Sequence, residues 1–274
     1  MSKNEIILRD PKQGALVKAT QQSQTFLTLL QQSDEQRLVE LLKSIDFKSA
    51  VELISSLEHI EWTAEFIEKY AEYWDCSSFS QNKALPWSME LIEGFEDSWS
   101  WGYCGLSDNE ALPWSIALIE RFENRWEWGV LEISDWGLSN NKDLPWSIAL
   151  IERFETRWNW EVLGLPLNQA LPWSIALIER FENRWEWGAL GLSGNEALPW
   201  SIALIERFED SWDWGYSGLP DNEALPWSID LLDKFKHKWD WRGLARNEKV
   251  QQIFTALSVQ GIEEVMDYHI EKLS

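Results

Sequence analysis

Pairs of tryptophans recur along this chain, and aromatic side chains at this regular spacing could bind a planar ligand. The pairs follow the pattern W-x-W and stand at 99/101, 126/128, 158/160, 185/187, 212/214 and 239/241. An exposed row of indole rings would offer a stacking platform for sugars or nucleic-acid bases. A buried row would instead hold neighbouring copies of a repeat together, because each tryptophan buries about 150–250 Å². We expect this structural role, and stacking only for rings that prove exposed.

Paired carboxylates form a second group with chemical potential. Glu120 and Glu123 stand three residues apart, and the pair recurs as Glu179 and Glu182. Glycosidase-type catalysis needs two carboxylates that face one cleft from different environments. These acids instead repeat identically from copy to copy, which favours a solvated helix face with Glu–Arg pairs.

Histidines and cysteines offer little further chemistry. His59, His237 and His269 are scattered, and none stands at metal-ligand spacing with a cysteine or another histidine. Cys76 and Cys104 are too few for a disulfide framework, and we expect two buried free thiols. The sequence also lacks a phosphate-binding glycine loop and the G-x-S-x-G and H-E-x-x-H motifs. We therefore expect a protein that is not an enzyme and uses neither cofactor nor metal.

A repeat of about 27 residues organises these side chains. The string LPWS occurs six times, with its tryptophan at 87, 114, 146, 173, 200 and 227. The one longer step, from 114 to 146, comes from extra residues in GVLEISDWGLSNN, which carries the off-pattern Trp136. A degenerate copy at 61–74 precedes the set. Repetition at a fixed period is typical of stacked repeat architectures.

Each copy predicts two short helices. In the copy that begins at position 171, Pro172 suits a first helical position, and apolar residues follow at helical spacing. Asn183 and Glu186 then form a capping-box pattern that predicts a second helix through the W-x-W pair. A β-solenoid or small β-blade, with W-x-W as alternating strand residues, is the alternative. The scarcity of Val and Thr in the copies favours helices.

An asparagine stands five residues before the tryptophan of every LPWS string. Because asparagine accepts left-handed backbone and bonds its own main chain, we interpret it as the residue that ends one helix and starts the turn. A ladder of ligand-binding amides is the alternative. The series comprises Asn82, Asn109, Asn141, Asn168, Asn195 and Asn222, and Asn247 continues it.

The flanks of the repeat lack tryptophan and look helical. Ser33 to Gln36 open one helix within residues 1–60, and Gly261 divides two helical stretches within 247–274. Open-ended stacks need atypical terminal units to cover their apolar ends. The sequence therefore predicts an all-α fold: a short α-solenoid of helix-turn-helix repeats over 61–246, with helical caps at 1–60 and 247–274.

The repeat pattern resembles a group of bacterial proteins. A W-x-W pair followed by L-S-x-N-x-x-L-P-W-S is similar to the Trp-rich short tandem repeats of various bacterial proteins, with related patterns in large DNA viruses. Here it reads WEWGALGLSGNEALPWS at 185–201 and, with a proline in place of the serine, SWDWGYSGLPDNEALPWS at 211–228. The resemblance covers about two thirds of the chain. It implies no shared activity and brings no functional residue.

Charge narrows the choice of partner. The formal net charge is -22, and residues 61–246 hold 33 acidic against 15 basic residues, or -18. Such a charge repels nucleic-acid phosphates and anionic lipids, so we expect no direct binding to nucleic acid or membrane. No apolar run approaches a membrane span and no signal peptide precedes the repeats, which indicates a cytoplasmic protein.

These features favour a non-catalytic protein–protein interaction scaffold whose partner is basic or of mixed charge. An acidic mimic of nucleic acid, which would inhibit a nucleic-acid enzyme, is one alternative. A carbohydrate-binding module that uses exposed tryptophans is another.

Partner contacts are expected where the copies differ, namely in the segments after each W-x-W pair. The insertion contributes Glu132, Asp135 and Trp136. The last unit is locally basic and could also associate with the acidic array of another copy. Its candidate residues are Lys234, Lys236, Lys238, Arg242 and Arg246.

Overall fold

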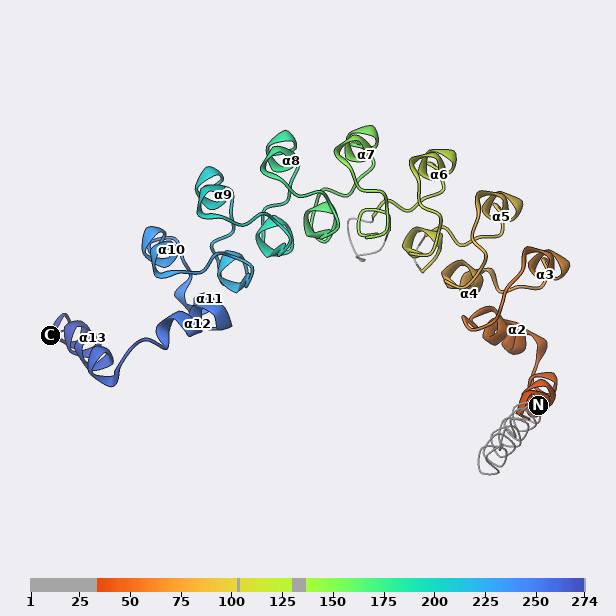
Figure 1. Cartoon of the computed structure of the whole chain (residues 1–274), viewed down its shortest axis with the longest axis horizontal. Coiled ribbons are helices and arrows are strands. Elements are labelled where there is room, and N and C mark those ends of the chain that lie inside the picture. The colour runs from red at the N-terminus through yellow and green to blue at the C-terminus, as the bar shows by residue number, and fades with distance from the viewer. Residues whose placement is uncertain (1–33, 103, 130–136, 274) are drawn as a thin grey trace, which may run out of the picture.

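The computed structural model describes residues 34–102, 104–129 and 137–273 of the chain. Every regular element in these residues is an α-helix or a 3-10 helix, which confirms the all-α prediction against the β-blade alternative. Figure 1 shows the elements as an open arc with an outer row on the convex side and an inner row on the concave side.

The outer row holds one short helix from each copy. These helices are α3 (Ala64–Lys69), α5 (Met89–Gly94), α6 (Ile116–Arg121), α7 (Ile148–Arg153), α8 (Ile175–Arg180), α9 (Ile202–Arg207) and α10 (Ile229–Lys234). The inner row contains α2 (Phe47–Ser55), α4 (Cys76–Gln81), η1 (Leu106–Asp108), η2 (Leu165–Leu167), η3 (Leu192–Gly194), η4 (Leu219–Asp221) and α11 (Trp241–Leu244). Successive inner elements contact one another from α2 to η1 and again from η2 to α11.

A serine, not the proline, starts each helix of the LPWS copies. Ser174 is the N-cap of α8, and its hydroxyl accepts a hydrogen bond from the Leu177 N–H at 3.1 Å. The prediction that Pro172 is the first helical residue is therefore wrong. Pro172 lies two residues before this N-cap, at the centre of a turn in which the Trp173 N–H donates to the Leu171 carbonyl oxygen at 2.7 Å. The helix ends at Arg180 with Phe181 as its C-cap, and Leu177 points into the core with no exposed surface.

The predicted second helix is wrong in the copy that begins at position 171, whereas in the last copy α11 does begin in the W-x-W pair, at Trp241. Asn183 is exposed and caps no helix, and the Glu186 N–H donates to the Trp160 carbonyl oxygen of the preceding unit at 3.1 Å. The W-x-W residues of this copy lie outside any helix, and the middle residue bonds to the preceding unit instead of along a helix. A single turn of 3-10 helix, η3, follows and ends at Asn195.

The two ends differ from the repeats. Residues 34–44 are helical, while Ser33 lies outside the described residues. At the other end α12 (Glu248–Phe254) and α13 (Val259–Glu271) are separated by residues 255–258, so Gly261 lies within α13 and does not divide the helices. No residue of α13 is buried, so this helix does not cover the end of the arc as a cap would. In the described part of the chain no helix is long and apolar enough to cross a bilayer.

Candidate functional site

The W-x-W tryptophans join each unit to the next. The ring of Trp160 lies 4.9 Å from that of Phe181 and 4.7 Å from that of Trp185, measured between ring centres. The indole N–H of Trp160 donates to the Glu155 carbonyl oxygen at 2.8 Å, and that of Trp185 donates to the Ile178 oxygen at 3.1 Å. The same two-ring contact is made by Trp101, Trp128, Trp187 and Trp214. These rings act as structural contacts, as expected.

The asparagines link consecutive units of the inner row. Asn168 is buried; its Nδ2 donates to Ser139 O at 2.9 Å and to Asn141 O at 3.3 Å, both in the preceding unit. Its Oδ1 accepts from the Ala170 N–H, and its carbonyl oxygen accepts the indole N–H of Trp173, each at 2.9 Å. The turn role predicted for these asparagines is therefore correct through the bond to the main chain, but the left-handed backbone expected of them is wrong, since Asn168 has a φ of -69°. Both amide atoms are engaged within the chain.

A serine or a proline sets a further connection between units, one that sequence reasoning missed. The hydroxyl of Ser193 donates to Trp187 O at 2.5 Å and accepts from the Asp213 N–H at 2.9 Å, so it bridges two units. Where Pro220 replaces this serine, Trp214 O accepts directly from the Asp240 N–H at 3.1 Å. Pro166 also replaces the serine, and there the Glu186 N–H donates directly to Trp160 O. The alternation of LS and LP in the copies was the signal for this difference.

Ion pairs run along the outer row from unit to unit. Arg207 Nε lies 2.6 Å from Glu179 Oε1, and Arg121 Nε lies 2.8 Å from Glu93 Oε1. At least twelve of the fifteen basic residues between 61 and 246 form ion pairs, ten of them with an acid of another unit. Because acids outnumber bases in this range, the unmatched charge on the surface is carboxylate.

The five predicted basic residues do not form one free patch. Lys234 pairs with Glu206 and Lys238 with Glu209 at 2.9 Å, so both continue the ladder of the outer row. The hydrogen bond to Glu209 raises the pKa of Lys238.

The other three predicted cations also have partners. Lys236 pairs with Asp233 at 2.9 Å within its own unit, and Arg242 pairs with Asp240 at 3.2 Å. Arg246 stacks on the ring of Tyr216, with 4.9 Å between the guanidinium carbon and the ring centre. The predicted contacts of the insertion, Glu132, Asp135 and Trp136, lie outside the described residues.

Exposed apolar side chains occupy the segments that follow the W-x-W pairs. We call residues 161–164, 188–191 and 215–218 the variable strip, since the copies differ there and each segment precedes an inner-row helix. Val162 is 46% exposed, Leu190 52% and Tyr216 40%. Glu161 is exposed beside them. Sequence reasoning identified the strip as non-repeated, but not which of its side chains are exposed.

Other groups add no reactive cluster. Cys76 and Cys104 are free and half-buried rather than buried, and burial raises the pKa of the Cys76 thiol. Across the described residues no three His, Cys, Asp or Glu side chains are arranged to hold a metal ion. No protein-family model matches the sequence, and no match was found among curated proteins or solved structures. The geometry of the surface therefore carries the functional proposal.

Proposed function

We propose that the chain is a short α-solenoid of Trp-rich repeats that serves as a cytoplasmic, non-catalytic protein-interaction scaffold. The recurring tryptophans, asparagines and serines support this architecture, since each bonds or packs against a neighbouring unit. Residues that bond or pack between units specify the scaffold. The surface where the copies differ is left for recognition, as is common in repeat proteins.

The observation that carries the proposal is the variable strip itself. Monomeric proteins expose single apolar residues routinely, but here Val162, Leu190 and Tyr216 recur in the corresponding segments of three consecutive units, the path that we call the variable strip. Carboxylates such as Glu161 accompany this path, and the outer row already uses the basic side chains in ion pairs. A partner that offers apolar side chains within a basic or mixed-charge surface fits this path best.

A tryptophan shelf for sugars receives less support. Among the described tryptophans Trp241 is the one that exposes more than a third of its surface, and it lies at the end of the arc. The other described rings are buried or half-buried, so they offer no continuous stacking surface.

Affinity capture from cells that express the chain tests the proposal. The wild-type chain is compared with a strip variant, Val162→Ser, Leu190→Ser and Tyr216→Ser. The matched control carries Ile116→Ser, Ile148→Ser and Ile175→Ser, at outer-row positions that are 38%, 37% and 38% exposed. We expect a protein that the wild type and the control retain and the strip variant loses.

If all three chains retain the captured protein equally, the variable strip is not its binding surface. A captured protein that the control alone loses would place the binding surface on the outer row instead. Circular dichroism of each variant, compared with wild type, checks that the fold is preserved.

A further inference from the structure

The last unit ends with an aromatic ring that no following unit covers. The indole N–H of Trp241 donates to Lys236 O at 3.3 Å, as that of Trp214 donates to Glu209 O at 2.9 Å. The ring of Trp214 also packs on Trp239 of the next unit, with 4.6 Å between ring centres. Among the described residues no aromatic ring packs on Trp241 in this way, and 49% of its surface is exposed.

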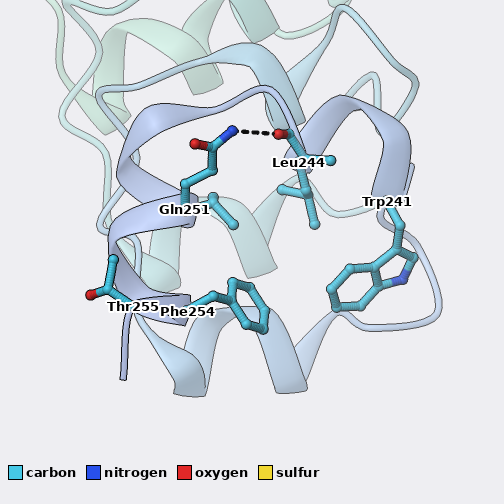
Figure 2. A pocket seen from close by; sticks show the side chains of 7 residues that line it. Trp241, Leu244, Gln251, Phe254 and Thr255 are labelled. Atoms are coloured by element: carbon cyan, nitrogen blue, oxygen red, sulfur yellow. Dashed lines mark hydrogen bonds between the residues drawn. The ribbon is translucent and has the colours of Figure 1, made fainter. Parts of the chain in front are cut away.

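A hollow of about 430 Å³ lies beside this ring. Figure 2 shows Trp241 and Phe254 on either side of it. Ile229 of the same unit is 68% exposed, whereas Ile175, the corresponding residue of an internal unit, is 38% exposed. Helix α12, which provides Phe254, therefore leaves the side of the last unit that would face a further unit largely uncovered.

The first unit carries the rings on which such a tryptophan packs. Inside the arc, the ring of Trp101 lies 4.9 Å from that of Phe122 and 4.8 Å from that of Trp126, both in the next unit. Tyr70 and Trp74 take the places of Phe122 and Trp126 in the first unit. Their rings lie 5.9 Å apart at 81°, against 6.1 Å and 90° for the internal pair.

Hydrogen bonds place the first unit in the same register. The indole N–H of Trp74 donates to Ile67 O at 2.8 Å, and that of Trp126 donates to Ile119 O at 3.0 Å. In both units the acceptor stands seven residues before the tryptophan. Trp74 is thus held as the internal tryptophans are.

The place of a preceding tryptophan is a hollow at this end of the arc. It measures about 440 Å³ and lies between α2 and α3, where Phe47, Tyr70, Tyr73 and Trp74 line it. Phe47 is 65% exposed and Tyr73 55%. We call these four side chains the N-terminal hollow. Among the described residues no tryptophan of a preceding unit packs there.

The asparagine contact of the last unit is already closed within the chain. Asn247 Nδ2 donates to Pro220 O at 2.9 Å, as each asparagine of the series does to the unit before it. The corresponding oxygen of the last unit, Ala245 O, accepts instead from Gln251 Nε2 at 2.6 Å (Figure 2). A further unit would therefore find mainly apolar surface here, whose burial is favourable.

We propose that copies of this chain associate head to tail, with Trp241 of one copy in the N-terminal hollow of the next, against Tyr70 and Trp74. The occupant is a second copy because the two ends carry the two halves of the contact that joins Trp101 to its next unit inside the arc. Such a contact leaves one free end of each kind, so it adds further copies instead of stopping at a pair. The association does not use the variable strip.

Sedimentation velocity of the full chain across a wide concentration range tests this association. We expect a mass above the 32.2 kDa of one chain that rises with concentration. Trp241→Glu blocks one end and Tyr73→Glu the other, at positions 49% and 55% exposed, so each variant alone should stay monomeric. Ile148→Glu, at a 37% exposed position in the middle of the outer row, is the matched control and should associate like the wild type. Circular dichroism checks that each variant keeps the fold.

An equimolar mixture of the two blocked variants separates a head-to-tail contact from a symmetric one. The Trp241→Glu chain keeps its N-terminal hollow and the Tyr73→Glu chain keeps Trp241. The mixture should therefore form a pair of twice the chain mass and nothing larger. A wild type that stays monomeric throughout, a single variant that still associates, or a mixture that stays monomeric would each overturn the proposal.

Discussion

Asn195 donates its Nδ2 proton to the carbonyl oxygen of Pro166, 2.8 Å away in the preceding unit. The same side chain accepts from the Ala197 N–H at 2.8 Å and is 1% exposed. One buried amide therefore closes a turn within its unit and fixes the distance to the neighbour. Because a buried polar group without a partner is costly, this arrangement explains why the residue recurs in register.

Asn195→Ala removes the donor and the acceptor together. It leaves Pro166 O and the Ala197 N–H without these bonds, so we expect the free energy of unfolding to fall by roughly 2 to 4 kcal/mol. Asn183→Ala, at an exposed position, is the control and should change it little. Urea denaturation followed by tryptophan fluorescence measures both. Equal losses would contradict the role of the buried amide.

The serine bridge predicts a difference between two substitutions at one position. Ser193→Ala leaves Trp187 O and the Asp213 N–H without their shared hydroxyl, at a cost of about 1–3 kcal/mol. Ser193→Pro should cost less, since Pro166 and Pro220 occupy this position where the two backbones bond directly. Thermal unfolding of the wild type and the two variants ranks their stabilities. A proline variant less stable than the alanine variant would refute this interpretation.

Position along the arc should decide the cost of losing a tryptophan. Trp160 is 6% exposed between two units, so Trp160→Ala should lower the free energy of unfolding by about 3–5 kcal/mol. Trp241→Ala removes the equivalent ring at 49% exposure and should cost well under half as much. Denaturation at low protein concentration keeps any association between chains from contributing to the measured free energy of unfolding. Similar losses would show that the terminal ring is covered.

Asp108 should make stability depend on pH. Burial raises the pKa of its carboxyl, although the Gly137 N–H at 2.7 Å and the Cys104 N–H at 3.2 Å both donate to it. A group with a raised folded pKa binds its proton more tightly when folded, so this group's contribution to stability falls as pH rises from its usual value of 3.8 through the folded value.

The Asp108→Asn variant removes this titration. Relative to the variant, the wild type should therefore lose free energy of unfolding as pH rises across that window. Urea titrations at a series of pH values measure the difference between the two proteins. A difference that stays constant with pH, or that grows in favour of the wild type, would contradict the assigned shift.

Sequence reasoning identified the first helix of each unit but misplaced its start. The letters of a capping box are present at Asn183 and Glu186, yet local pattern does not reveal that the Glu186 N–H bonds to Trp160 in another unit. The serine cap was also available in the string LPWS and was overlooked in favour of Pro172. A contact between units decides the case of Glu186, and such contacts join residues about 27 positions apart in the sequence.

The candidate surface was predictable in position but not in detail. Differences between copies marked the variable strip, whereas the exposure of Val162 and Leu190 depends on how the turns pack. The basic last unit was visible as composition, but Lys234 and Lys238 continue an ion-pair ladder that only the stacking of helices creates. The uncovered state of Trp241 likewise follows from the absence of a following unit among the described residues.

Hydrogen–deuterium exchange of the chain with and without its captured partner tests whether the variable strip is the binding surface. We expect the partner to slow exchange in residues 161–164, 188–191 and 215–218, with little change in the outer helices α7 to α9. Protection confined to those outer helices, with the variable strip unchanged, would contradict it.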